Sequence, residues 1–175
     1  NSYQQALQDF NRVLSLDTGD TARAQALFYR GLTFSRRGEH IQAVADFNRA
    51  IELESENPAF FNERGRAYSG AGEHDRALED FDQALQREPD MLEAFANRGL
   101  VHSRRGDYVR AIADYDQAIE LNNGDGVKPQ QARAAGARLY RYRGLAFLRM
   151  QDYAKAVDDF NQSLRVHPDD AFTLN

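Results

Sequence analysis

The chain has 175 residues, of which 42% are hydrophobic and 28% charged, and it contains no cysteine. This composition is typical of a globular protein, and the lack of cysteine excludes disulfides and thiol chemistry. The formal net charge of −5 argues against general affinity for nucleic acid, and no apolar run approaches the roughly 18 residues of a membrane span. The compartment stays open between cytoplasm and periplasm.

In chain order, the sequence predicts one helix over residues 3–16 and then four blocks of two helices each. The blocks follow the dipeptide Arg-Gly, which recurs every 34 residues and, before its last copy, after 45 residues: Arg30-Gly31, Arg64-Gly65, Arg98-Gly99 and Arg143-Gly144. The first helices are expected over 24–37, 58–71, 92–105 and 127–150, and the second helices over 39–54, 73–88, 107–120 and 152–165.

The second helices carry a small, an aromatic and a small residue at spacings of four and three, which places all three on one helix face. These triplets are Ala43-Phe47-Ala50, Ala77-Phe81-Ala84, Ala111-Tyr115-Ala118 and Ala156-Phe160-Ser163. A 34-residue period with this pattern resembles the tetratricopeptide repeat (TPR) family, specifically bacterial-type repeats that contain Arg-Gly. The resemblance covers nearly the whole chain, although the family's tryptophan is replaced by Leu27, Phe61, Phe95 and Tyr140.

The resemblance implies an all-α fold, a right-handed superhelical solenoid of antiparallel helix pairs. We expect a single TPR solenoid over residues 1–175. Its parts are the second helix of a truncated repeat (1–20), full repeats at 24–57, 58–91, 92–125 and 137–170, an insertion at 126–136, and the start of a further repeat at 171–175.

The insertion at 126–136 is the main irregularity of the repeat pattern. Eleven residues equal about three helical turns, so the insertion is expected to lengthen the next first helix without rotating its faces. That helix is predicted to run from Pro129 to Met150, with Gly136 as its only breaker. Two interpretations stay open, a tolerated insertion and one wall of a binding groove.

Two sets of internal contacts are predicted from the repeat register. Gly31 and its equivalents are expected to face Ala43 and its equivalents, because helices approach closely only where side chains are small. The aromatic residue of each second helix then completes the core of the next repeat. Arg30 and its equivalents are expected to pair with aspartates, either within the repeat (Arg30 with Asp46) or in the preceding one (Arg30 with Asp9).

No enzymatic site is predicted. His40 and His74 occupy a column that Tyr108 and Tyr153 fill in the other repeats, which indicates a packing role. No arrangement of nucleophile, base and orienting acid is present, and the glycines lie at turns and helix crossings. We therefore expect no cofactor, no bound metal and no catalytic residue.

Charge separates between the two sets of helices. Counting Lys and Arg against Asp and Glu, the first helices carry +12 and the second helices −11. In TPR arrays the first helices line the concave surface, so the resemblance implies a basic groove on an acidic protein. The residues expected to bind a ligand there are Phe28, Leu32, Asn62, Arg66, Asn97, Leu100, Arg138, Arg141, Leu145 and Arg149.

Arginine binds carboxylates well, and apolar walls strengthen the effect of each charge. The predicted function is therefore a protein-protein interaction scaffold that binds an acidic or carboxylate-bearing peptide segment of a partner. The alternative is that these helix faces are merely solvated. The lysines with which some TPR proteins hold acidic chaperone tails are missing, so chaperone-tail binding is not predicted.

Two other functions remain as hypotheses. The same arginines could bind nucleic acid, with Tyr140-Arg141-Tyr142-Arg143 supplying stacking and charge, although the net charge and the presence of only two lysines count against it. The chain also starts and stops within a repeat. Tyr3, Leu7 and Phe10 then belong to a helix whose partner is missing, which predicts end-to-end self-association.

Overall fold

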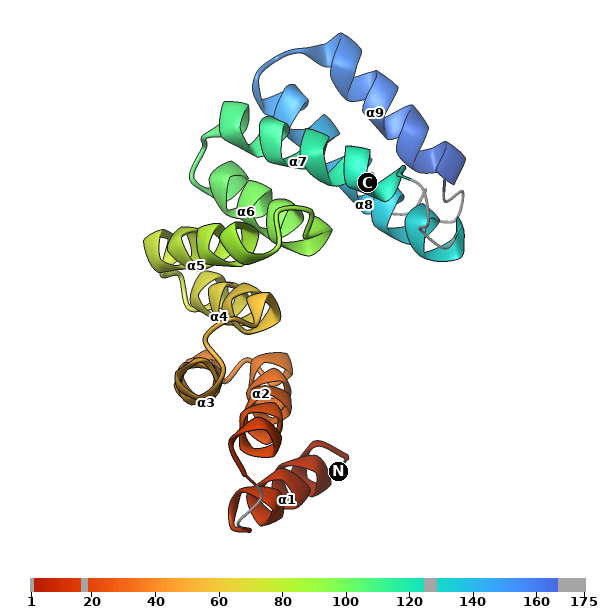
Figure 1. The fold of residues 1–175 in the computed structure, drawn as a ribbon. Helices are drawn as coiled ribbons and strands as arrows, with labels where there is room; N and C mark the ends of the chain where they lie inside the picture. Colours follow the sequence, from red (N-terminus) through yellow and green to blue (C-terminus); the bar gives the residue numbers. More distant parts are fainter. Residues whose placement is uncertain (1, 17–18, 125–128, 167–175) are drawn as a thin grey trace. The chain divides into compact units, whose positions relative to one another are not determined.

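The structure is a computed structural model, and it describes residues 2–16, 19–124 and 129–166. Within these ranges it is all helical and contains no strand, which confirms the predicted all-α fold of antiparallel helix pairs (Figure 1). The helices are α1 (Ser2–Leu14), α2 (Gly19–Arg36), α3 (His40–Leu53), α4 (Pro58–Gly70), α5 (His74–Arg87), α6 (Leu92–Arg104), α7 (Tyr108–Asn122), α8 (Pro129–Arg149) and α9 (Tyr153–Val166).

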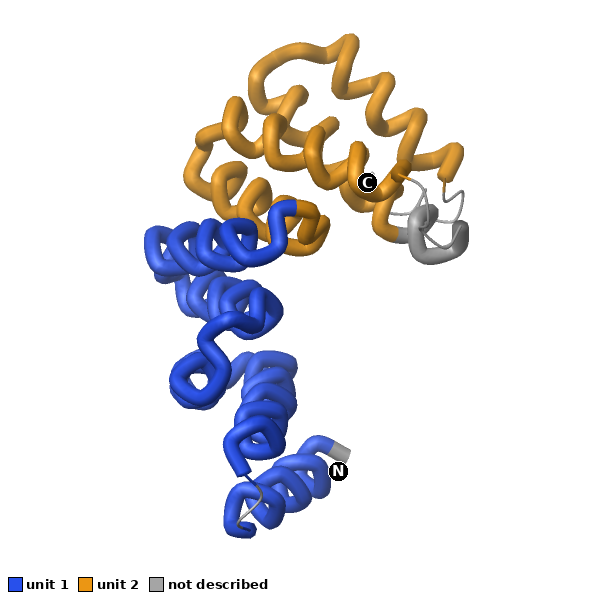
Figure 2. Tube along the Cα trace, viewed as in Figure 1, with its two compact units in different colours: residues 1–89 blue, residues 90–175 orange. Residues whose placement is uncertain are grey.

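The chain divides into two compact units, residues 1–89 and residues 90–175 (Figure 2). In unit 1, α2 packs against α3 and α4 against α5, while α1 contacts α2 and α3 contacts α4. In unit 2, α6 packs against α7 and α8 against α9, and α7 contacts α8. Each unit is therefore a series of helical hairpins. Within a unit, the second helix of one repeat also touches the first helix of the next repeat.

Most helix bounds lie close to those expected from the sequence, with one informative exception. The first helix α2 begins at Gly19, before the expected residue 24, and its first turn contains Asp20, which favours the positive end of the helix dipole. α8 is one helix of 21 residues from Pro129 to Arg149, so the prediction of a single lengthened first helix is confirmed for this span. The start of the expected further repeat lies outside the described residues.

The turns inside the hairpins depend on a left-handed residue. Gly38, Gly72 and Gly106 have φ angles of 78°, 83° and 81°, a conformation that glycine adopts without steric cost. The fourth hairpin places Gln151 there, with φ 64°. A side chain in this region is strained by about 1 kcal/mol or more, so the fourth turn is the least favourable of the set.

The closest approach between the helices of a hairpin joins a glycine to an aromatic ring. A Cβ built on Gly31 would lie 2.8 Å from the ring of Phe47, and the three nearest atoms all belong to that ring. The rings of Phe81, Tyr115 and Phe160 stand equally close to Gly65, Gly99 and Gly144. The expected close crossing at these glycines is therefore filled mainly by the aromatic ring, and at Gly65 the backbone oxygen of Ala77 also lies 3.1 Å from the built Cβ.

The aromatic residues of the second helices also link neighbouring repeats, as predicted. Phe47 is fully buried and clusters with Ala43 of its own helix and with Ala67 of the next first helix, α4. Its ring centroid lies 5.8 Å from that of Phe28 on α2. Phe47 therefore holds three helices together, and the core continues from one repeat into the next within the unit.

Candidate functional site

Four arginines of the first helices are bound to aspartates inside the stack. Arg64 donates from Nε and from Nη2 to the two carboxylate oxygens of Asp80, at 2.8 and 2.6 Å. The same two-point contact joins Arg30 to Asp46, Arg98 to Asp114 and Arg143 to Asp159. Of the two pairings considered from the sequence, the one within the repeat is therefore observed.

A third hydrogen bond joins Arg30, Arg64 and Arg143 to the preceding second helix. Arg30 donates from Nη1 to Asn11 Oδ1 at 2.6 Å, so on the preceding helix Asn11 accepts, and not Asp9, which was the alternative partner considered from the sequence. Arg64 donates in the same way to Asn48, and Arg143 to Asp116. Each such arginine thus connects two second helices across the first helix that lies between them.

These arginines are structural and stay charged. The side chain of Arg143 is 20% exposed, and that of its partner Asp159 is 6% exposed. The hydrogen bond to Asp159 raises the pKa of Arg143 above its ordinary value, against the opposing effect of burial. Since Nε, Nη1 and Nη2 of Arg143 each already donate a hydrogen bond to a carboxylate, Arg143 is poorly suited to bind a ligand.

The predicted groove residues of unit 1 lie on α2 and α4, which contact each other. Phe28 is half-buried, with its ring centroid 4.9 Å from that of Phe60, and Leu32 packs against the Phe47 cluster. This part of the surface is apolar and firmly packed.

The polar groove residues of unit 1 are tied to a neighbour that the sequence analysis did not single out. Asn62 is only 2% exposed and donates to Glu63 Oε1 at 3.1 Å, while Arg66 bonds to Glu63 Oε2 at 2.6 Å. Glu63 therefore balances the charge of Arg66. The signal was present in the sequence, because residues three apart on a helix are neighbours on its surface.

The predicted groove residues of unit 2 lie on α6 and α8, which also contact each other. α6 supplies Asn97 and Leu100, both half-buried. α8 supplies a face with Arg138, Arg141, Leu145 and Arg149, together with Leu148. Leu145 and Leu148 are each 42% exposed. The spacings of three and four residues place these five side chains on one side of the helix, which we call the α8 face.

The charge of the α8 face is not balanced from within its own helix. α8 contains five arginines and no acidic residue. Arg138 and Arg149 are exposed and have no hydrogen-bond or ion-pair partner among the described residues. Arg141 is half-buried and lies over the ring of Tyr142, at 5.6 Å from its centroid.

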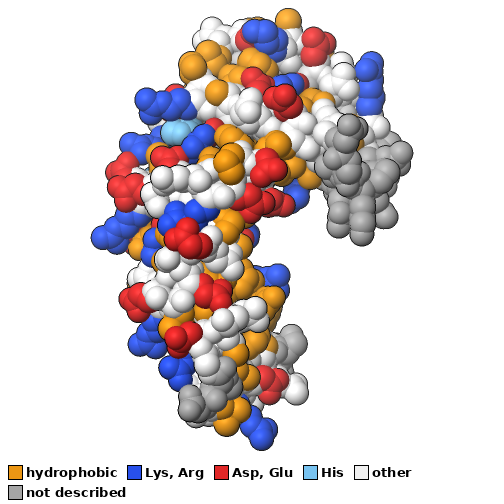
Figure 3. All heavy atoms as spheres, viewed as in Figure 1, with side chains coloured by type: hydrophobic (Ala, Val, Ile, Leu, Met, Phe, Trp, Pro, Cys, Tyr) orange, Lys and Arg blue, Asp and Glu red, His pale blue; other side chains and the backbone are white. Residues whose placement is uncertain are grey.

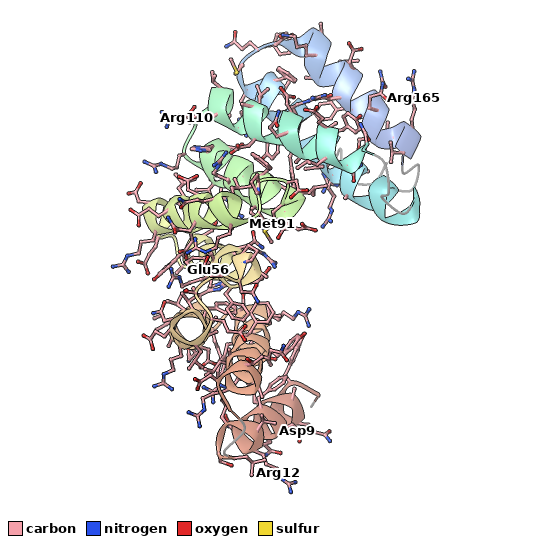
Figure 4. All side chains as sticks on the ribbon, in the orientation of Figure 1. Asp9, Arg12, Glu56, Met91, Arg110 and Arg165 are labelled. Carbon is pink, nitrogen blue, oxygen red and sulfur yellow. The ribbon has the colours of Figure 1, made fainter. Side chains whose placement is uncertain are left out.

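The rest of the visible surface has mixed charge. Figure 3 shows Lys and Arg interspersed with Asp and Glu over both units on the face drawn. Arg110 on α7 and Arg165 on α9 point away from the helices in Figure 4, and both side chains are exposed. Arg110 and Arg165 therefore serve as exposed arginines on second helices, and the effect of changing them can be compared with the effect of changing the arginines of the α8 face.

His40 and His102 pack within the fold, as the sequence indicated for His40. A Cβ built on Gly70 would lie 2.5 Å from the His40 ring, so this ring covers the glycine of the next first helix. His102 is 9% exposed, and burial lowers its pKa. Among the described residues there is no group of three or more potential metal ligands, and no helix has the length and apolar character needed to span a membrane.

The sequence matches two family profiles, both described as tetratricopeptide repeat. One matches residues 1–58 and 62–126, and the other matches residues 137–170. No curated protein matches the sequence.

Several solved structures share the fold. MamA is similar with a TM-score of 0.78 and 21% identity, over 97% of this chain and 91% of that chain. MamA from Desulfovibrio magneticus RS-1 is similar with a TM-score of 0.79 and 15% identity, over 98% of this chain and 89% of that chain. YrrB, described as a TPR protein with an unusual peptide-binding site, is similar with a TM-score of 0.70 and 19% identity, over 97% of this chain and 80% of that chain. At these identities the similarity shows the fold alone.

Proposed function

Because the chain belongs to the tetratricopeptide repeat family, whose members are generally non-enzymatic scaffolds, we propose that it binds an acidic or carboxylate-bearing peptide segment of a partner protein. The segment lies against the first helices, and its negative charges contact the α8 face. This proposal narrows the general role of a protein-protein interaction scaffold to one chemistry and one surface.

The observation that carries the proposal is the composition of α8. Its exposed face places Arg138 and Arg149, both without a partner among the described residues, on either side of Leu145 and Leu148. Exposed leucines between cations suit a segment that alternates apolar and acidic residues, because burial of the leucines strengthens the neighbouring charge contacts. Residues 129–136 of the insertion lengthen α8 on the N-terminal side of this face.

The proposed roles differ between the two units. In unit 2, Arg138, Arg141 and Arg149 bind carboxylates, Leu100 and Leu145 contact apolar side chains, and Asn97 bonds the peptide backbone. In unit 1, Phe28 and Leu32 offer apolar contact and Asn62 orients Glu63, while Arg66 binds a ligand only if the ligand displaces Glu63. The proposed site keeps the ligand-binding residues predicted from the sequence except Asn62, which is buried and orients Glu63, and Arg66 contributes less than Arg138.

A pair of matched peptides tests the chemistry of the ligand. A fluorescein-labelled peptide with glutamates and leucines in a Gly-Ser background is compared with the same peptide in which glutamine replaces every glutamate. We expect the acidic peptide to bind at least about tenfold more tightly, since a charge-assisted hydrogen bond contributes about 1.5–3 kcal/mol.

Equal binding of the two peptides contradicts the proposal. So does an unlabelled single-stranded oligonucleotide that binds the chain more tightly than the acidic peptide, because the arginines then serve a nucleic-acid backbone.

A further inference from the structure

A cavity of about 360 Å³ lies in unit 1 between α1, α2 and α3. Its apolar wall consists of Leu14, Leu27 and Leu53, all part of one packed cluster in which Leu27 is 4% exposed. Its charged lining consists of Arg23, Arg30, Arg49 and Glu52. The volume is at the low end of the range for ligand sites, about 300–1,000 Å³, so only a small group fits.

The charges around the cavity are not balanced. Arg30 is neutralised by Asp46, which it holds by two hydrogen bonds. Arg23 and Arg49 remain, and neither has a partner among the described residues. Among the described residues that line the cavity, Glu52 is the only acidic one, so this part of the lining keeps an excess of one positive charge beside its apolar wall.

The next hairpin junction of the same unit holds different residues in the equivalent space. In positions 34 residues later, Phe61 replaces Leu27 and Arg87 replaces Leu53. The Arg87 guanidinium lies 4.2 Å from the Phe61 ring centroid, and its Nε donates to the Ser55 carbonyl oxygen at 2.9 Å. The guanidinium of Arg87, lying on the Phe61 ring, therefore fills the second junction, which is formed by α3, α4 and α5. At the first junction, formed by α1, α2 and α3, Leu27 and Leu53 leave the space open.

The first junction also carries cations that the second lacks. Arg23 corresponds to Asn57, and Arg49 corresponds to Gln83. The two leucines at the first junction are thus accompanied by two arginines in the lining of the cavity. An apolar recess with unpaired arginines is suited to a carboxylate attached to an apolar group, because guanidinium groups bind carboxylates in a planar two-point contact.

We propose that the cavity between α1, α2 and α3 binds a carboxylate carried on an aromatic or aliphatic group. The apolar group packs on Leu27 and Leu53, and the carboxylate bonds to Arg23 and Arg49. The ligand is either a free organic acid or the C-terminal residue of a peptide, which share this chemistry. The site is separate from the α8 face and belongs to a different set of helices, so the two proposals stand independently.

Isothermal titration with two probes, 4-phenylbutyrate and acetyl-Gly-Gly-Phe with a free C-terminus, tests the site. Each is compared with a neutral counterpart, 4-phenylbutanol and the peptide amide. We expect each acid that binds to do so at least about tenfold more tightly than its neutral counterpart. Tighter binding of the peptide indicates a partner's C-terminus, and tighter binding of 4-phenylbutyrate indicates a free acid.

Three variants locate the binding. Arg49→Glu keeps the fold, because Arg49 is exposed, and is expected to weaken the bound acid by about tenfold or more. Leu27→Phe combined with Leu53→Arg copies the filled junction and is expected to abolish binding. Arg110→Glu on α7 is the control and is expected to leave binding unchanged.

Either of two results overturns the proposal. One is the absence of binding by both acids at millimolar concentration. The other is unchanged binding in Arg49→Glu or in the double variant with the filled junction.

Discussion

Arg64 and Asp80 form a two-point ion pair at 2.8 and 2.6 Å, with the aspartate side chain only 5% exposed. Removal of the arginine leaves a buried carboxylate without its partner, which is costly because the charge is cut off from water. We expect Arg64→Ala to lower the free energy of unfolding by about 3 kcal/mol in urea denaturation.

An exposed pair of the same unit is the control for this prediction. Arg76 and Glu73 are 61% and 44% exposed, so Arg76→Ala should cost at most about 1 kcal/mol. Similar losses for the two variants would show that the buried pair has no special role.

The contact between Gly31 and Phe47 gives a second prediction. Gly31→Ala would place a methyl group 2.8 Å from the Phe47 ring, which forces the helices apart. We expect a loss of about 1–3 kcal/mol of stability. Phe47→Leu in the same chain should recover part of it relative to the sum of the two single changes, and a double-mutant cycle measures that coupling. Strict additivity would contradict this account of the contact.

The left-handed turn at Gln151 predicts a stabilising substitution. Its three equivalents are glycines, and Gln151 has φ 64°. Gln151→Gly should raise the stability of unit 2 by about 0.5–1 kcal/mol, because relief of strain exceeds the entropic cost of glycine. Gly106→Gln is the reverse change and should be destabilising by a similar amount. If Gln151→Gly lowers the thermal midpoint, the turn is held by contacts of the glutamine side chain.

His102 makes the stability of unit 2 depend on pH. Burial lowers its pKa, partly opposed by Asp114 and Asp107, while Arg98 and Arg110 act in the same direction as burial. The unfolded chain therefore binds a proton more readily than the folded one, and stability falls as pH drops below the unfolded value of about 6.5.

Replacement of His102 removes this component. The equivalent residues Phe34 and Phe147 show that phenylalanine fits the position. Denaturant midpoints at about pH 7.5 and about pH 5 should differ less for His102→Phe than for the wild type. An equal or larger pH dependence in the variant would assign the effect to other groups.

Much of the fold follows from the 34-residue register. The register aligns Arg30 with Asp46 within one hairpin, and a guanidinium on a half-buried helix face needs such a carboxylate. The register does not determine the side-chain rotamer of Arg30, which decides the residue that this arginine reaches on α1. Arg30 reaches Asn11 and not Asp9, and this depends on the path of the side chain across α2.

The candidate site was less predictable than the fold. The repeat pattern predicted the same ligand-binding role for Arg66 and Arg138, since both are arginines on first helices. The structure separates them, because Glu63 is near enough to pair with Arg66 whereas α8 contains no acidic residue. The cavity beside Arg49 was equally hidden, because it depends on the volume difference between Leu27 and Phe61.

The central claim is that the α8 face binds acidic segments, and charge reversal on that face tests it most directly. The acidic peptide is titrated against Arg138→Glu/Arg149→Glu and against the matched double variant Arg110→Glu/Arg165→Glu, with fluorescence anisotropy as the readout. Both pairs are exposed and change the net charge equally. We predict that the α8 pair weakens binding by at least about tenfold and reduces its salt dependence, while the control pair has little effect. Equal losses in the two double variants, or a loss confined to the Arg110/Arg165 pair, would contradict the account.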